Sequence, residues 1–193
     1  MPPKAKFTEA EIIEAALNVV RADGMSGLTA RTLGTKLGSS ARPIFTVFQS
    51  MEEVQKTVVE AAKKLYADYV EKGLAEEIPF KGVGKQYILF AINEPKLFHL
   101  LFMTEQENVP DLSGVLPVID ESYEKILASV QDGYGMDRVS AQKLYQHLWI
   151  YTHGIATLCA TKTCRFTGQQ ISEMMTEVCM SLLRNWKAGK END

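Results

Sequence analysis

The sequence predicts an all-α protein of about nine helices. Apolar residues recur at the spacing i, i+3, i+4, i+7 through most of the chain, which places them on one face of a helix. No segment alternates apolar and polar residues in the way that a half-buried strand does. Threonine, serine and glycine also stand where helices of this kind begin and end.

The composition is that of a globular protein with a sizeable core. The chain has 193 residues, of which 46% are hydrophobic and 23% charged, with 13 glycines and 7 prolines. These values exclude collagen-like and disordered chains. No apolar run approaches the roughly 18 residues of a membrane span, and the basic start of the chain is not followed by the apolar core of a signal peptide. We therefore expect a soluble, cytoplasmic protein with no membrane partner.

Two helices are expected before residue 38. Thr8 and Glu11 have the spacing of a capping box, which starts the first helix, and Gly24 ends it. Thr29 is placed to cap a second helix of about two turns, and Gly38 closes that helix. The apolar stripe of the first helix consists of Ile13, Ala16, Leu17 and Val20.

A third short helix is expected from about residue 39 to residue 48. Pro43 falls in its first turn, where the missing amide proton costs little. Its expected buried face consists of Ile44, Phe45 and Phe48. Ser50 and Glu53 then have the spacing of a second capping box, which starts a longer helix that runs to about residue 72.

The rest of the chain is expected to form longer helices that are richer in aromatic residues. Their expected ranges are 81–93, 95–103, 112–131, 137–163 and 167–187. The last two keep the helical stripe along their length. Two long apolar faces exceed what one small domain needs to bury, so we expect both helices to form a four-helix interface with a second copy of the chain.

A basic window without acidic residues lies in the first third of the chain. Residues 24–51 include Arg31, Lys36 and Arg42 and no aspartate or glutamate, although the formal net charge of the whole chain is -3. A window of this kind tolerates a polyanion nearby. We therefore treat it as a candidate nucleic-acid contact.

Residues 29–48 have the order of a helix-turn-helix, with a short helix, a glycine turn and a second short helix. An ordinary pair of short packed helices is the alternative. Residues 12–54 as a whole resemble the N-terminal DNA-binding domain of TetR/AcrR-family transcriptional regulators. The matching positions are Thr29, Arg31, Gly38, Ser40, Ile44, Phe45, Phe48, Ser50 and Glu52.

The resemblance implies a three-helix helix-turn-helix domain at residues 1–50, joined to a larger helical domain for effector binding and dimerisation at residues 51–193. It implies a homodimeric repressor that a small apolar ligand of unknown identity releases from a double-stranded DNA operator. The alternative is a helical, DNA-associated dimerisation module without a small-molecule switch. The expected DNA-binding residues are Thr29, Arg31, Ser39, Ser40, Ala41, Arg42, Phe45, Thr46 and Lys56.

Four positions depart from the family pattern. Arg42 and Pro43 replace the usual Gly-Thr of the recognition helix, Phe45 replaces a tyrosine, and Met51 replaces a lysine. Phenylalanine has no hydroxyl group and methionine no ammonium group, so two expected phosphate contacts are missing. We expect Arg42 and Lys56 to replace them.

The effector site implied by the resemblance would lie among the large, soft side chains of the second half. Methionine and aromatic residues suit an adaptable apolar pocket, although core packing is the alternative for any one of them. The expected ligand-binding residues are Phe90, Phe102, Met103, Tyr123, Trp149 and His153.

No pattern indicates catalysis, a cofactor or a metal. The three histidines are scattered, and no arrangement typical of a nucleophile with its base occurs in the local sequence. The run Gly82–Lys85 lacks the spacing of a phosphate-binding loop, so helix initiation explains it better. We therefore do not expect an enzyme.

The three cysteines are expected to be free, in accord with a reducing compartment. Cys159 and Cys164 are five residues apart, which is about 140° around a helix, so they are expected to face different ways and not to pair. Small, partly buried side chains are the expected role of both, and a redox-sensing thiol is the alternative.

Overall fold

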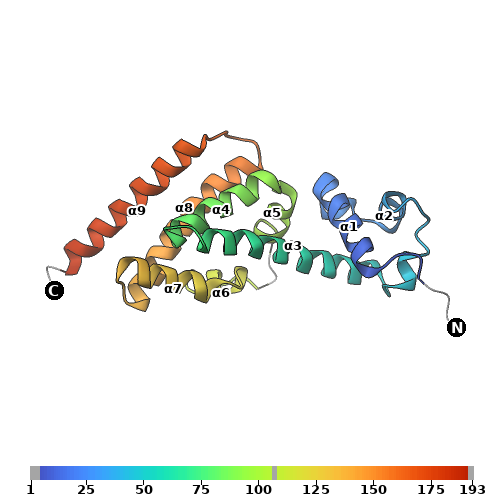
Figure 1. Cartoon of the computed structure of the whole chain (residues 1–193), viewed down its shortest axis with the longest axis horizontal. Coiled ribbons are helices and arrows are strands. Elements are labelled where there is room, and N and C mark those ends of the chain that lie inside the picture. The colour runs from blue at the N-terminus through green and yellow to red at the C-terminus, as the bar shows by residue number, and fades with distance from the viewer. Residues whose placement is uncertain (1–4, 106–107, 191–193) are drawn as a thin grey trace. The chain divides into compact units, whose positions relative to one another are not determined.

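The computed structural model describes residues 5–105 and 108–190, and within them it confirms the all-α fold (Figure 1). Nine α-helices, two short 3-10 helices and no strand occur in these residues. The helices are α1 (Glu9–Asp23), α2 (Ala30–Lys36), α3 (Met51–Leu74), α4 (Pro79–Asn93), α5 (Pro95–Phe102), α6 (Val115–Ile119), α7 (Tyr123–Tyr134), α8 (Arg138–Ala160) and α9 (Gly168–Lys190). None of them is long and apolar enough to cross a membrane.

The chain forms two compact units, and helix α3 contributes to both. The first unit consists of Met1–Tyr66 with Glu94–Glu105, and the second consists of Ala67–Asn93 with Gln106–Asp193. The division of function expected at residue 50 stays a prediction, because a compact unit alone assigns no function.

Helix α1 is the centre of the first unit, where α2 and α5 both pack against it. The predicted capping box starts it, since Thr8 Oγ1 accepts from the amide of Glu11 at 3.2 Å and the Glu11 carboxylate accepts from the amide of Thr8 at 2.7 Å. Ile12, Ala16 and Val20 on its inner face are fully buried. Capping and apolar spacing therefore both determine this helix.

A close backbone contact holds the turn after α2. The amide of Ser39 donates to the carbonyl oxygen of Gly34 at 2.9 Å. A Cβ atom at Gly34 would lie 3.0 Å from the backbone nitrogen of Ala41, so only glycine allows this approach without displacement. Gly38 has φ of +62°, which a glycine adopts without strain. The two glycines thus allow the chain to reverse after α2, so that the backbone of residues 39–41 packs closely against Gly34.

The predicted third helix is wrong. Residues 39–48 contain only a 3-10 turn at Ile44–Thr46, and the amides of Ile44, Thr46 and Val47 donate three residues back. Pro43 has no amide proton and disfavours helical backbone in the residue before it. The Thr46 hydroxyl also donates to the carbonyl oxygen of Pro43 at 2.6 Å, competing with a helical bond.

Phe45 was also placed wrongly on the buried face of this segment. Its neighbours Ile44 and Phe48 are buried, but 46% of the Phe45 side chain is exposed. The 3-10 turn causes the difference, because its three residues per turn leave the residue after Ile44 pointing outward.

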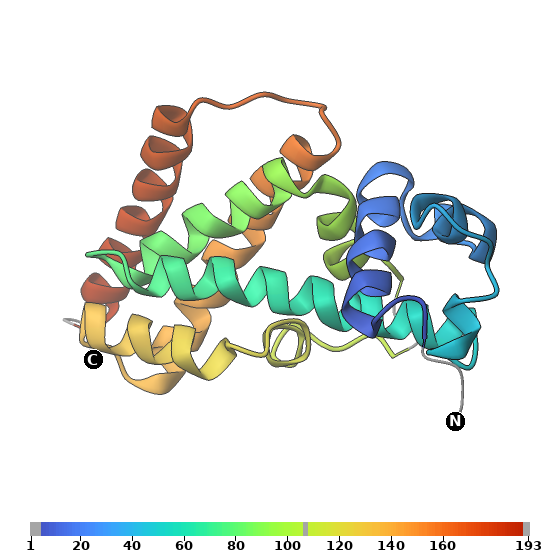
Figure 2. The same ribbon diagram turned by 45° about the vertical axis from the view of Figure 1, so that its right-hand side comes forward.

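Helices α4 and α8 form the core of the second unit, with α7 packed against both and α9 against α8 (Figure 2). The end of α3 meets the start of α4 at two glycines, where a Cβ atom on Gly73 would lie 2.6 Å from the backbone nitrogen of Val83. The buried side chains of α8 are Ala141, Leu144, Tyr145, Leu148, Thr152, Ile155 and Ala156.

Two predicted helices have different bounds in the structure. The segment 112–131 is divided between α6 and α7, because Asp120 is extended and its carboxylate accepts from the amide of Ser122 at 2.8 Å. Helix α8 ends at Ala160 and not at residue 163, because Lys162 adopts φ of 57°. A side chain in this left-handed conformation ends a helix.

Candidate nucleic-acid interface and effector site

The predicted DNA-binding residues lie at the N-cap of α2, in α2, in the segment after it and in the first two turns of α3. Ser39 and Ala41 are half-buried, and the other seven are exposed. The hydroxyl of Thr29 caps α2, where it accepts from the amide of Thr32 at 3.2 Å. Thr29 therefore fixes the start of α2, and its exposure leaves that helix end open to solvent.

Lys6 is a neighbour of this surface that the sequence reasoning did not select. Its ammonium group donates to Ser39 Oγ at 3.1 Å. The signal available in the sequence was the basic start of the chain, but nothing in the local pattern indicates that it returns to residue 39. The contact adds a fourth basic side chain to Arg31, Lys36 and Arg42.

Lys56 forms an ion pair with Glu52 one helical turn earlier, with 2.8 Å between nitrogen and oxygen. The carboxylate raises the pKa of Lys56, and the ammonium group lowers the pKa of Glu52. Both side chains are about three-quarters exposed, so solvent screens the pair and its contribution to stability is small. Lys56 is therefore able to exchange this partner for a phosphate group.

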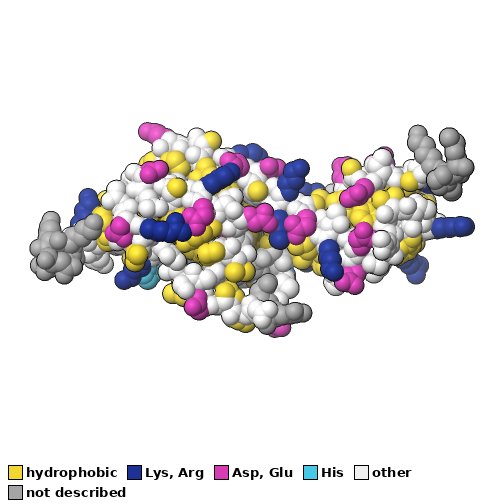
Figure 3. Space-filling model, turned by 90° about the horizontal axis from the view of Figure 1, so that it is seen from below, with side chains coloured by type: hydrophobic (Ala, Val, Ile, Leu, Met, Phe, Trp, Pro, Cys, Tyr) yellow, Lys and Arg dark blue, Asp and Glu magenta, His cyan; other side chains and the backbone are white. Residues whose placement is uncertain are grey.

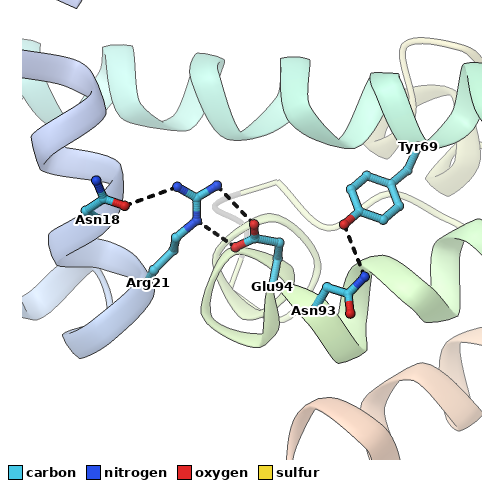
Figure 4. A network of polar contacts seen from close by, with 5 residues as sticks. All are labelled: Asn18, Arg21, Tyr69, Asn93 and Glu94. Carbon is cyan, nitrogen blue, oxygen red and sulfur yellow. Dashed lines mark hydrogen bonds and ion pairs between the residues drawn. The ribbon is translucent and has the colours of Figure 1, made fainter. Parts of the chain in front are cut away.

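An ion pair joins α1 to the start of α5 within the first unit (Figure 4). Arg21 donates through Nε and Nη2 to the two carboxylate oxygens of Glu94 at 2.8 and 2.9 Å. Only 15% of the Glu94 side chain is exposed. A bidentate ion pair of this kind fixes the relative orientation of the two side chains as well as the distance between them.

The predicted ligand-binding residues are divided between the two units. Phe102 and Met103 belong to the first unit, where the Phe102 ring packs edge-on against Tyr66 with centroids 4.9 Å apart. Phe90, Tyr123, Trp149 and His153 belong to the second unit. Fully buried Phe90 packs edge-on against Tyr69, whose hydroxyl accepts from the Asn93 side chain at 3.3 Å (Figure 4). The assignment of all six to one site stays a prediction.

A chain of polar contacts joins Trp149, Tyr87 and His153 in the second unit. The hydroxyl of Tyr87 lies 2.8 Å from His153 Nδ1 and also bonds to the Trp149 side chain. Indole nitrogen can only donate, so the Tyr87 oxygen accepts from Trp149. The same hydroxyl either donates to His153 Nδ1 or accepts from it, depending on which imidazole tautomer is present. The sequence reasoning missed Tyr87, because its place on the stripe of α4 marks it as core.

Burial controls the protonation of these groups. It lowers the pKa of His153 and raises the pKa of Tyr87 well above its ordinary value. The negative charge of buried Asp120 adds to the increase for Tyr87, and it also raises the pKa of Tyr145. The neutral forms of all three side chains are therefore favoured at neutral pH.

Tyr123 belongs to a separate aromatic cluster. Its ring stacks on Tyr145 with centroids 5.9 Å apart, and Tyr145 packs edge-on against Phe80. The arrangement supplies apolar contact surface and a few hydroxyl groups, which suit binding rather than chemical transformation. No group of histidine, cysteine and acidic side chains able to hold a metal occurs among residues 5–105 and 108–190.

No protein-family model and no curated protein sequence matches the chain. Solved structures do match it. A protein of unknown function from Rhodococcus sp. RHA1 is 18% identical with a TM-score of 0.65, covering 90% of this chain and 92% of its own. The fatty acid degradation regulator FadR from Bacillus halodurans is 16% identical with a TM-score of 0.59, covering 90% and 93%.

A third structure connects the fold with a family. It is a candidate TetR-family transcriptional regulator from Mesorhizobium loti MAFF303099, which is 18% identical with a TM-score of 0.53 and covers 91% of this chain and 94% of its own. FadR and the candidate TetR-family protein are both described as regulators. The chain has the all-helical fold of the TetR-family transcriptional regulators.

Proposed function

We propose that the chain is a one-component transcriptional regulator whose first unit binds a double-stranded DNA operator. The observation that carries the proposal is the surface formed by α2 and residues 39–48, which is hydroxyl-rich and lies in a window without acidic residues. A helix-turn-helix presents a surface of this kind to the major groove. The regulator fold supports the same conclusion.

Different residues of this surface are assigned different contacts. Arg42 is exposed two residues before the 3-10 turn, and an arginine side chain can read guanine through two hydrogen bonds. Exposed Phe45 and half-buried Ala41 supply apolar contacts to bases. Hydroxyl, basic and backbone groups at the remaining positions bind phosphate. The assigned phosphate contacts are Thr29, Arg31, Ser39, Ser40, Thr46 and Lys56.

Selection of bound sequences from random double-stranded DNA tests the proposal with the full-length reduced protein. Enrichment of one motif supports it and gives the operator. The same selection with Lys81→Ala, which removes an exposed lysine from α4 in the second unit, is expected to return the same motif. Recovery of unselected DNA by the unchanged protein would contradict the proposal.

We further infer that the regulator is a repressor and that an apolar small molecule binds in its second unit. Trp149, His153 and Phe90 supply aromatic surface, and the Tyr87–His153 contact supplies polar groups. Since one neighbour of the same fold is a regulator of fatty acid degradation, long-chain fatty acids are the first ligands to test. Native mass spectrometry detects the complex. Equal ligand affinity with and without the operator would show that the ligand is no inducer.

We also propose that the chain acts as a homodimer through α8 and α9. No described side chain of α9 is buried, although its apolar stripe is continuous. Met175 on this stripe packs inward, where Thr152 Oγ1 lies 3.2 Å from its sulfur atom. On the face seen from below in Figure 1, hydrophobic side chains of the second unit lie between charged ones (Figure 3). On α8 and α9, Ile150, Leu158 and Met180 are exposed. A second copy would cover such surface.

A further inference from the structure

The junction between α8 and α9 folds back on itself. Lys162 donates its amide to the carbonyl oxygen of Cys159 at 3.0 Å, and the amides of Thr163 and Cys164 both donate to the carbonyl oxygen of Leu158, at 3.0 and 3.2 Å. The left-handed backbone of Lys162 makes this reversal. Cys164 therefore lies beside the last turn of α8 and does not continue it.

This turn removes the premise of the prediction that Cys159 and Cys164 face different ways. The angle of about 140° holds only for a continuous helix, and α8 ends at Ala160. Leu158 O belongs to the peptide bond that joins Leu158 to Cys159, and it accepts from the amide of Cys164. Standard bond lengths then place the Cα atoms of the two cysteines no more than about 7 Å apart. Disulfides form at Cα separations of up to roughly that distance.

The two thiol groups also interact electrostatically. Burial raises the pKa of Cys159, and the negative charge of the Cys164 thiolate raises it further. Cys164 is exposed and Cys159 is half-buried, and neither forms a disulfide in the structure. The pair thus combines one accessible thiol with a second, less accessible thiol nearby, as redox-sensing cysteine pairs do.

We propose that the α8–α9 junction is a redox modification site, in which a hydroperoxide converts Cys159 and Cys164 into a reversible intramolecular disulfide. The Cys164 thiolate attacks one oxygen of hydrogen peroxide, the O–O bond breaks, and sulfenic acid and hydroxide form. The Cys159 thiolate then attacks the Cys164 sulfur, the S–S bond forms, and hydroxide leaves. In total two thiols lose two electrons and two protons, and the peroxide is reduced to two molecules of water.

Exposure determines the order of the two thiols. Cys164 meets the oxidant first because it is exposed, whereas burial disfavours the thiolate of Cys159. Cys179 is the third cysteine, and its sulfur lies 3.7 Å from the Tyr134 hydroxyl. Its pKa is raised by burial as well, so it is expected to react slowly. It therefore provides a control.

The test treats the reduced full-length protein with stoichiometric hydrogen peroxide and measures its intact mass. The unchanged protein and Cys179→Ser are expected to lose the mass of two hydrogen atoms, and peptide mapping is expected to join the peptides that contain Cys159 and Cys164. Dithiothreitol is expected to restore the original mass. Cys159→Ser is expected to stop at the sulfenic acid of Cys164, and Cys164→Ser is expected to form no intramolecular disulfide.

Three results would overturn the proposal. The first is oxygen addition to the unchanged protein with no loss of hydrogen. The second is a disulfide that joins two chains, which non-reducing electrophoresis detects. The third is equal disulfide formation in Cys164→Ser. Circular dichroism of each serine variant establishes that the variant is folded, and none of these measurements requires DNA.

Discussion

Arg42 and Ser40 lie two residues apart and are expected to act on different parts of the DNA. If Arg42 reads guanine, Arg42→Ala should weaken binding to the best site by about 1–3 kcal/mol and relax the preference at one position. Ser40→Ala should weaken all sequences alike, because phosphate contacts carry no sequence information. Competition binding with single-base operator variants distinguishes the two effects. Unchanged affinity in Arg42→Ala would remove it from the site.

His153 is expected to make stability depend on pH. Burial lowers its pKa in the folded state, so below the ordinary value of 6.5 the unfolded state binds more protons. Stability should be complete above this pH and fall as the pH decreases through 6.5 toward the folded-state pKa. Denaturant unfolding at a series of pH values measures the effect. His153→Phe should reduce the slope.

Lys162 is the only described non-glycine residue with positive φ. An L side chain is strained in this conformation and glycine is not, so Lys162→Gly is expected to stabilise the protein by roughly 0.5–1 kcal/mol. Thermal unfolding checks the direction. A decrease in stability would show that the lysine side chain makes a contact that outweighs the strain.

At the scale of elements, helix starts were more predictable than helix interruptions. The capping residues of α1 and α2 lie next to the amides that they cap, so the local sequence specifies them. The helix expected at residues 39–48 failed because Pro43 and the Thr46 hydroxyl compete with helical bonds. The interruption at Asp120 depends on a side-chain bond to Ser122 that apolar spacing does not reveal.

The same difference between local and distant contacts holds for the candidate sites. The predicted DNA-binding residues, which stay a prediction, lie within one short segment except for Lys56, so the local pattern was enough to select them. Lys6 reaches Ser39 from 33 residues away, and Tyr87 reaches His153 from 66 residues away. Contacts over such distances depend on tertiary packing, so the sequence indicates the residue types but not their partners.

The turn after α2 is expected to depend on Gly34. Gly34→Ala should lower stability by about 1–3 kcal/mol, because its Cβ atom would press on the backbone at Ala41, and it should also weaken DNA binding. Gly133→Ala in α7 is the matched control, since a Cβ atom there meets nothing within 4 Å. That change should stabilise the protein by about 0.5–1 kcal/mol, because alanine favours helices. Chemical denaturation of both variants makes the comparison.

At the scale of the whole molecule, the proposed dimer depends on α9. Val178→Glu should convert the dimer to monomer, because a charge in an apolar interface loses its hydration. Ala128→Glu places the same charge on an exposed position of α7 and should leave the dimer intact. Sedimentation velocity distinguishes the species. An unchanged dimer with Val178→Glu would place the interface elsewhere.

The absence of buried side chains on the described part of α9 also bears on the lifetime of the protein. A helix that buries so little apolar surface unfolds locally at a low free-energy cost, and its backbone amides then exchange with solvent quickly. Proteases cleave locally unfolded segments, so a free monomer should be cleaved first between α8 and α9. Dimerisation would protect this junction from cleavage, because a higher protein concentration favours the dimer over the monomer. The amount of protein would then set its own rate of turnover, with dilute molecules degraded sooner than concentrated ones.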